Sequence, residues 1–227
     1  MKTIISVIML IMMTTLSYAN DIYVTQSGNA LDLDITQDGE NNTVGNSTTA
    51  SASAGVTTIL NIDQIGDSNV ITYQINGATY TGVINLVGNS NNVDLNCDST
   101  GGNSSCGTAN AVINFTGSSN DIDLDIGQTS SANTADVDIV GQSGSDSNVV
   151  AATVDGNSAV LTITVNGDTN NYLIDIDGNG DSVGHTLIHS HTGGIADVDI
   201  IQSGTNDNMI TLTTSGDNAD IDISQTD

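Results

Sequence analysis

Apolar and polar residues alternate along most of this chain, in short runs that end at a glycine. An apolar side chain at every second position is the pattern of a β-strand with one buried face. The apolar stripe of an amphipathic helix does not occur, so the pattern predicts an all-β protein. The clearest runs are Leu33/Ile35, Leu60/Ile62, Leu161/Ile163/Val165 and Val198/Ile200.

The glycines that end these runs recur at intervals of 11 residues, which indicates an internal repeat. Each of about seventeen units holds one short strand and a turn, and it cannot bury its apolar face alone. We therefore predict a parallel two-sided β-solenoid with about eight rungs of roughly 22 residues. The absence of proline agrees, because interior strands need every backbone N–H. An antiparallel β-sandwich is the alternative architecture.

The first 19 residues have the composition of a cleaved export signal. Lys2 gives a basic start, Ile4 to Leu16 form an apolar core, and small residues precede a cleavage point after Ala19. A membrane anchor is the alternative, but the apolar run is shorter than a full membrane span. The expected organisation is a signal peptide at 1–19 and one β-solenoid repeat domain at 20–227, with insertions near 44–56 and 97–107.

Several units carry a sharper motif, in which a glutamine follows two alternating apolar residues and precedes the glycine by two positions. The glutamine shares the parity of the apolar residues, so its side chain is expected to point inward. Stacked amides can donate to and accept from their copies in adjacent rungs, which predicts an amide ladder along the column. For any single copy, a solvated turn glutamine is the alternative. The predicted ladder residues are Gln26, Gln37, Gln64, Gln142 (in a looser copy) and Gln202, with Asn42, Asn69, Asn148 and Asn208 and the turn glycines Gly28, Gly39, Gly66 and Gly204.

The spacing Gln-x-Gly-x-x-Asn, at Gln37 to Asn42 and Gln64 to Asn69, resembles the curlin repeats of bacterial curli fibre subunits. The resemblance covers most of the chain in period and fewer units in motif. It implies export through a dedicated outer-membrane secretion machinery, assembly on a nucleator, and self-polymerisation into an amyloid-like extracellular fibre of the biofilm matrix that serves cell adhesion. The chain departs from the curlin pattern where Ile75, Phe115 or Val165 stands in place of glutamine.

The charge balance excludes several classes of partner. The chain has 227 residues, of which 27 are acidic and one is basic, for a formal net charge of −26. Without lysine or arginine beyond Lys2, it cannot neutralise a nucleic-acid backbone or clamp a nucleotide phosphate. An acidic polysaccharide substrate would be repelled for the same reason. We therefore expect no enzyme, no catalytic residues and no nucleic-acid or nucleotide partner.

Aspartates occupy the outward parity of several predicted strands, as Asp-x-Asp pairs. Stacked carboxylates repel one another, and Ca²⁺, low pH or salt would relieve that repulsion. The segment from Asp175 to Asp181 resembles the start of an EF-hand loop, so Asp175, Asp177, Asn179 and Asp181 are the candidate calcium ligands. The twelfth loop position is Thr186 instead of glutamate, and a plain solvated turn is the alternative.

Two cysteines flank a loop rich in glycine, serine and asparagine. In an exported chain, Cys97 and Cys106 most simply form a disulfide, worth about 2 to 3 kcal/mol; two unpaired thiols are the alternative. His185, His189 and His191 lie within one unit. We expect them on a solvent-exposed strand without a functional role, and a transition-metal site is the alternative.

Three classes of function fit these patterns. The first is a secreted structural fibre subunit, because the last unit, Asp220 to Gln225, resembles an interior strand and nothing blunts its edge. The second is a monomeric calcium-binding cell-surface adhesin, which would need distinct terminal caps. The third is an ice-binding solenoid, which needs regular outward Thr-x-Thr rows of the kind seen at Thr162/Thr164 and Thr211/Thr213. We predict the first, with further copies of the chain as its main partner.

Overall fold

The computed structural model describes residues 21–27, 30–39, 42–45, 51–97, 108–127, 134–155, 158–177, 185–204 and 208–226. The predicted signal peptide, Gly28 and parts of the two predicted insertions lie outside the described residues. The described segments form seventeen strands whose pairings are all parallel. The prediction of an all-β parallel solenoid is therefore confirmed. None of these segments is a helix of the length and apolarity that a membrane span requires.

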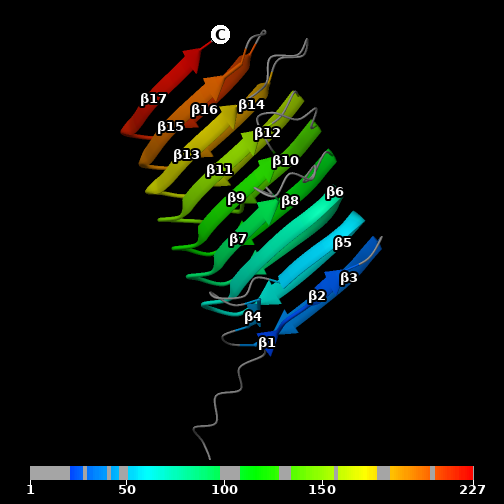
Figure 1. Ribbon diagram of the computed structural model, residues 1–227. Coiled ribbons are helices and arrows are strands. Elements are labelled where there is room, and N and C mark those ends of the chain that lie inside the picture. Colours follow the sequence, from blue (N-terminus) through cyan, green and yellow to red (C-terminus); the bar gives the residue numbers. More distant parts are fainter. Residues whose placement is uncertain are drawn as a thin grey trace, which may run out of the picture.

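Two parallel sheets face each other across the core, and we call them sheet A and sheet B (Figure 1). In the regular part of the column, successive strands alternate between the sheets, and each pairs with the strand two positions along. Sheet A contains β3 (Ala30–Asp38), β8 (Thr108–Thr116), β10 (Thr134–Gly141), β12 (Ser158–Asn166), β14 (Thr186–Thr192) and β16 (Met209–Ser215). Sheet B contains β1 (Asp21–Ile22), β4 (Thr43–Val44), β7 (Asn92–Cys97), β9 (Asp121–Gly127), β11 (Val149–Asp155), β13 (Asn170–Asp177), β15 (Ala196–Ser203) and β17 (Ala219–Thr226).

The first part of the column is less regular. Two long strands, β5 (Ser51–Ile65) and β6 (Val70–Val87), contribute to both sheets, and β2 (Thr25–Ser27) pairs with the start of β5. The regular strands from β7 to β17 form about six turns of the solenoid. With β3 and the second halves of β5 and β6, sheet A stacks eight strand segments, so the predicted count of about eight rungs is close. The difference from the prediction is that units in the first part run together as long strands.

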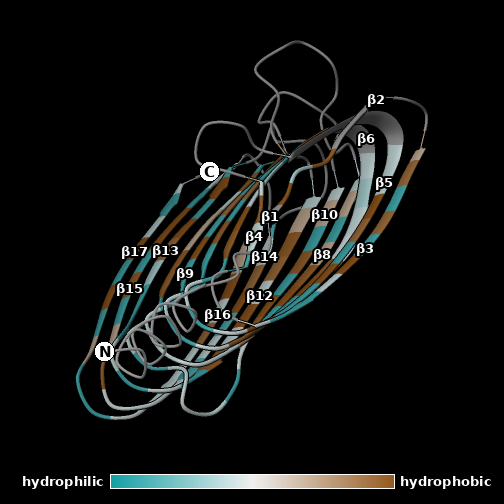
Figure 2. Cartoon of the chain, turned by 90° about the horizontal axis from the view of Figure 1, so that it is seen from below, coloured by the Kyte–Doolittle hydropathy of each residue, from teal (hydrophilic) through white to brown (hydrophobic). Residues whose placement is uncertain are grey.

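The register keeps the same parity in every turn, so apolar side chains stack on apolar side chains. Ile139 of β10 lies between Ile113 of β8 and Ile163 of β12, and all three are fully buried. Figure 2 shows the result as apolar and polar stripes that alternate across the strands. Full burial of one isoleucine contributes roughly 1.5 to 3 kcal/mol. These aliphatic stacks are therefore the main source of stability in the column.

Close stacking of the turns requires glycine at the ends of the sheet A strands. Gly66 and Gly88 both have a φ of 139°, in a region that other residues avoid. A Cβ atom on Gly88 would lie 1.9 Å from the carbonyl oxygen of Gly66 in the adjacent turn. The recurring glycines of the sequence are therefore turn positions, as predicted.

Candidate functional site

A ladder of buried asparagines follows one corner of the column, where sheet A turns into sheet B. The backbone N–H of each asparagine donates to Oδ1 of the asparagine in the next turn, at 2.8 to 3.0 Å. Every member is 2% exposed or less. The members are Asn42, Asn69, Asn91, Asn120, Asn148 and Asn170.

The side-chain Nδ2 group forms a hydrogen bond within the turn to which the asparagine belongs. Nδ2 of Asn69, Asn91 and Asn120 donates to the carbonyl oxygen of the glycine three residues earlier, at 2.7, 3.0 and 2.9 Å respectively. Each of these side chains thus satisfies a backbone acceptor in its own turn and a backbone donor in the turn beside it. Buried backbone groups need such partners, so the ladder fixes both the turn and the stacking.

The predicted ladder residues Asn42, Asn69 and Asn148 lie in this ladder, and the other three members were missed. The missed asparagines follow units without a glutamine, and the shorter motif Gly-x-x-Asn would have found them. The bonds join side chain to backbone, and the amide-to-amide contacts that stacking predicts are not the rule here. The ladder ends at Asn170, because Ala196 occupies the next register position.

The glutamines on the inward parity form two short pairs. Nε2 of Gln64 donates to Oε1 of Gln37 at 2.7 Å, and Nε2 of Gln225 donates to Oε1 of Gln202 at 3.2 Å. The register places Leu86 next to Gln64, so the first pair does not continue. In the described part of the chain, the predicted glutamine ladder is therefore confined to the N-terminal end of sheet A and the C-terminal end of sheet B.

The remaining predicted ladder residues have other surroundings. Gln142 was predicted to point into the core, but it is exposed at the turn after β10. Oδ1 of Asn208 accepts a hydrogen bond from the backbone N–H of His185 at 3.1 Å, and its carbonyl oxygen accepts one from Gln225 at 2.9 Å. The side chain of Gln26 lies outside the described part.

The C-terminal end of the column is a strand of interior type without a cover. Ile223 is 49% exposed, whereas its register partner Ile200 in β15 is 1% exposed. Ile221 is 37% exposed, whereas its partner Val198 is fully buried. Among the described strands, only β15 pairs with β17, so the outer edge of β17 is open.

The N-terminal end is open in the same way. β3 pairs with β5 on one side, and no other described strand pairs with it. Its inward residues Leu31 and Leu33 are only partly buried, whereas Leu60, the partner of Leu33 in β5, is fully buried. The two ends therefore expose the apolar and backbone groups that the interior turns cover.

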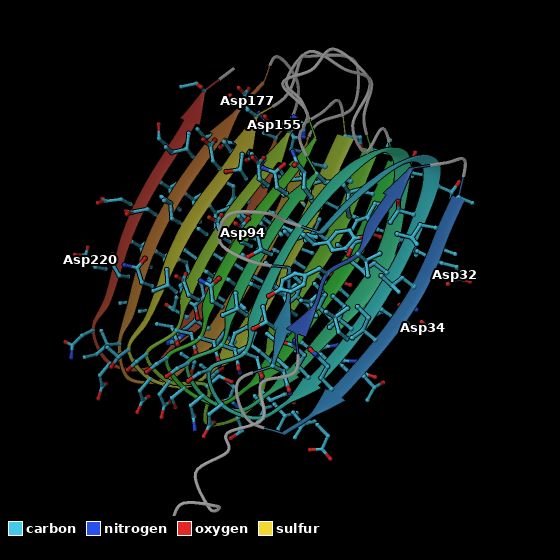
Figure 3. The ribbon with its side chains drawn as sticks, turned by 60° about the horizontal axis from the view of Figure 1, so that its bottom comes forward. Asp32, Asp34, Asp94, Asp155, Asp177 and Asp220 are labelled. Atoms are coloured by element: carbon cyan, nitrogen blue, oxygen red, sulfur yellow. The ribbon has the colours of Figure 1, made fainter. Side chains whose placement is uncertain are left out.

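Aspartates line the outside of the column, as predicted. Figure 3 shows Asp32 on β3 and Asp220 on β17 pointing away from the core, on opposite sides. Burial raises the pKa of Asp123 above its ordinary value, and the charges of Asp94 and Asp121 in the same rows raise it further. The stacked carboxylates therefore repel one another in the folded chain.

The predicted calcium ligands are only partly described. Asp175 and Asp177 lie on the outer side of β13, and Asn179 and Asp181 lie outside the described residues. Burial raises the pKa of Asp175, and the charge of Asp177 adds to the effect. The described residues contain no group of three or more histidine, cysteine, aspartate or glutamate side chains arranged to hold a metal ion. Calcium binding at this loop stays a prediction.

The three histidines are buried, contrary to the expectation of a solvent-exposed strand. His189 is 0% exposed, and both of its ring nitrogens lack a hydrogen-bond partner. Tyr172 packs edge-on against it with ring centroids 4.4 Å apart, and the Tyr172 hydroxyl lies 2.9 Å from Nδ1 of His191. Burial, and secondly the neighbouring His191, lowers the pKa of His189 to about 4. The parity of both histidines with Leu187 gave a signal for this burial in the sequence.

Cys97 at the end of β7 is buried and disulfide-bonded. The chain contains two cysteines, and the second, Cys106, lies outside the described residues. A bond between them closes the insertion near 97–107 at its base.

The open ends are the features through which this molecule can recognise another. Comparisons with family models, curated proteins and solved structures found no match for the chain. A function is therefore best inferred from the geometry of the two ends and from the sequence patterns above.

Proposed function

We propose that the protein is an exported structural subunit that polymerises end to end into an extracellular, amyloid-like fibre. The observation that carries the proposal is β17, whose side chains follow the interior pattern although the strand is exposed along its whole length. An uncovered strand presents unpaired N–H and C=O groups together with apolar side chains. A second copy stacked head to tail covers both, and such a contact repeats without closure.

The first described residues resemble the last strand at six of seven positions, the exception being Tyr23 against Asp222. Residues 220–226 read Asp-Ile-Asp-Ile-Ser-Gln-Thr, and residues 21–27 read Asp-Ile-Tyr-Val-Thr-Gln-Ser. Both segments belong to sheet B, at opposite ends of the column. Docking the N-terminal end of one copy on β17 of another therefore continues the apolar rows, with Val24 on Ile223 and Gln26 in register with Gln225.

Sheet A continues across the same junction. Aligning the turn glycines that follow β3 and β16 places Leu33 of one copy on Ile210 of the other, and Ile35 on Leu212. Covering a half-exposed isoleucine contributes on the order of 1 kcal/mol, and the junction covers several such side chains. The end of one column is thus a template for the start of the next.

Sequence patterns supply the setting of the proposed fibre. The apolar segment at 1–19 supports export, and the resemblance to curlin repeats supports a nucleator and an outer-membrane secretion machinery as partners, with biofilm matrix and adhesion as the role. The single basic residue argues against nucleic-acid and nucleotide partners and against an enzyme that acts on acidic polysaccharides.

The two alternative functions are less well supported. A monomeric adhesin needs a covered terminal turn, and within the part of the chain that the structure describes no strand covers β17. An ice-binding face needs unbroken rows of threonine on one sheet, but the register places Ile188 between Thr162 and Thr211. The fibre subunit is therefore the function that the geometry supports best.

Changing Ile223 to aspartate should stop end-to-end growth. The carboxylate would be buried without a partner at the junction, so we expect elongation to slow by at least about tenfold. In a single copy this side chain is 49% exposed, so the column itself tolerates the change. Light scattering of the purified chain and negative-stain microscopy of the product measure the effect.

Ser224→Asp is the matched control. It adds the same charge one residue along, on the outward parity of β17, and the variant should polymerise like the unaltered chain. Equal behaviour of the two variants would contradict the proposed junction. An unaltered chain that stays monomeric in salt, at low pH and with Ca²⁺ would contradict end-to-end assembly itself.

A further inference from the structure

Over the C-terminal strands of the column, the outer surfaces of the two sheets differ in charge, whereas Asp32 and Asp34 of β3 lie outward at the N-terminal end of sheet A (Figure 3). On sheet A, the outward side chains of β12, β14 and β16 are all uncharged; Val160, Thr164, Ile188 and Met209 are examples. On sheet B, across the core from them, β13, β15 and β17 carry carboxylates on the outward parity. These carboxylates are Asp175, Asp177, Asp197, Asp199, Asp220 and Asp222.

The uncharged surface continues towards the N-terminal end. The outward side chains of residues 79–87 in β6 and of β8 are threonine, asparagine and valine. In the described strands of sheet A from residue 79 to 215, Asp136 and Asp138 of β10 are the only acidic residues. We call the outer surface of these sheet A strands, from the second half of β6 to β16, the neutral face.

The neutral face is the side through which two columns can approach each other. With a formal net charge of −26, contact between two outer surfaces of sheet B would be strongly repulsive. Straight rows of threonine, asparagine and β-branched side chains, repeating at about 4.8 Å, interdigitate with a second such sheet about 10 Å away. Ile188 and Met209, which are 38% and 50% exposed, add apolar contacts.

The area of the neutral face predicts weak binding between single copies and strong binding between filaments. Strands β8, β10, β12, β14 and β16 with the second half of β6, at about 4.8 Å spacing and about 23 Å length, give roughly 650 Å² per copy. A typical stable interface buries about 800 Å² on each partner. A filament repeats the face once per copy, so the affinity of two filaments grows with their length. The fitting occupant is therefore a second filament of the same chain.

We propose that the neutral face is a lateral contact through which two filaments of this chain pair face to face. The inference rests on the proposed end-to-end assembly. In such a pair, sheet B of each filament faces solvent, and both outer surfaces of the pair are acidic. Because acidic surfaces repel, association stops at two filaments instead of continuing into thick bundles.

Ile188→Asp tests the neutral face, and Leu173→Asp is its matched control. Both replace an exposed aliphatic residue in the middle of a strand by the same charge, one on sheet A and the other on sheet B. We expect the unaltered chain and Leu173→Asp to give paired filaments, and Ile188→Asp to give single filaments of half the width. Negative-stain microscopy measures the width, and circular dichroism checks that each variant folds.

A second pair of variants removes negative charge instead of adding it. Asp136→Asn with Asp138→Asn removes the carboxylates that interrupt the neutral face, so pairing should begin at lower salt concentration. Asp197→Asn with Asp199→Asn removes the same charge from sheet B, and these filaments should associate further, into bundles wider than two. Sedimentation across a salt series separates the two outcomes.

Several results would overturn the inference. Single filaments of the unaltered chain, or equal loss of pairing in Leu173→Asp and Ile188→Asp, would contradict the neutral face and leave end-to-end assembly intact. Absence of filaments would contradict end-to-end assembly instead. The soluble copies would then be compared by sedimentation at high protein concentration, where even a weak contact forms dimers. A dimer lost only in Ile188→Asp supports the face, and a chain that stays monomeric there contradicts it.

Discussion

Replacing Asn120 by aspartate should destabilise the folded chain by about 3 to 5 kcal/mol, because it leaves a buried charge without a partner. Asn120 is 1% exposed. Aspartate has the same shape and keeps the Oδ1 acceptor for the backbone N–H of Asn91. It loses the Nδ2–H donor to the carbonyl oxygen of Gly117 and places a negative charge beside that oxygen.

The denaturant midpoint of the soluble chain measures this loss, with Asn110→Asp as the control. Asn110 is exposed on sheet A, so the same substitution there should change the midpoint little. The cost at Asn120 should shrink in acid, since a protonated carboxyl again has an O–H to donate to Gly117. Identical midpoints for the two variants at neutral pH would show that the ladder does not contribute to stability.

Mild acid should weaken the last turns of the column through His189. The pKa of this residue falls from 6.5 to about 4 on folding, so the folded chain holds it neutral while the unfolded chain takes up a proton. The stability that depends on a neutral His189 is fully present above pH 6.5, and the free energy of unfolding decreases as the pH falls towards about 4. The shift corresponds to about 3 kcal/mol.

The environment of His189 offers no compensation for a proton. Its register partners are Ile163 of β12 and Leu212 of β16, and the ring that faces it from sheet B belongs to Tyr172. The nearby His191 also has a pKa lowered by burial, and Asp168 opposes that shift only in part. An imidazolium at this place would therefore be a buried charge without a counter-ion.

The carboxylates act in the opposite direction at lower pH. Burial raises the pKa of Asp123 and Asp175 in the folded chain. A raised carboxyl pKa means that the folded state is penalised at higher pH and recovers stability as these groups are protonated. That gain is complete once the pH is below the ordinary carboxyl pKa of 3.8, so it overlaps the lower part of the range in which His189 reduces stability and offsets part of that loss.

His189→Leu separates the two effects. The substitution makes the row from Ile163 to Leu212 continuously aliphatic, so the loss between pH 6.5 and 4 should largely disappear while the gain from protonation of the carboxylates remains. Thermal unfolding followed by circular dichroism over a pH series measures both. An acid response that His189→Leu leaves unchanged would show that this histidine is not its cause.

The alternation of apolar residues was sufficient to predict the strands, their parity and the parallel solenoid. It depends only on the two faces of a strand, which every unit repeats. Applied to Leu187, the same rule would have placed His189 and His191 in the core. The expectation that they were exposed came from residue type and ignored the parity of the strand.

The register between turns could not be predicted from the pattern. The glutamine ladder failed because insertions and long strands set which residues are neighbours, and the neighbour of Gln64 is Leu86. The two long strands were not predicted for the same reason, since the residues of β5 and β6 do not divide into short strands. Asn91 was missed for a different reason: the motif required a glutamine, although the spacing from Gly88 to Asn91 carries the signal.

Parallel pairing makes the two extremities of the column chemically different. One is formed by residues 21–38 and the other by residues 209–226, and neither can replace the other at a junction. A fibre of such subunits has a direction, and its two tips can grow at unequal rates. Every breakage leaves one tip of each kind, so each fragment can start growth again without a new nucleus.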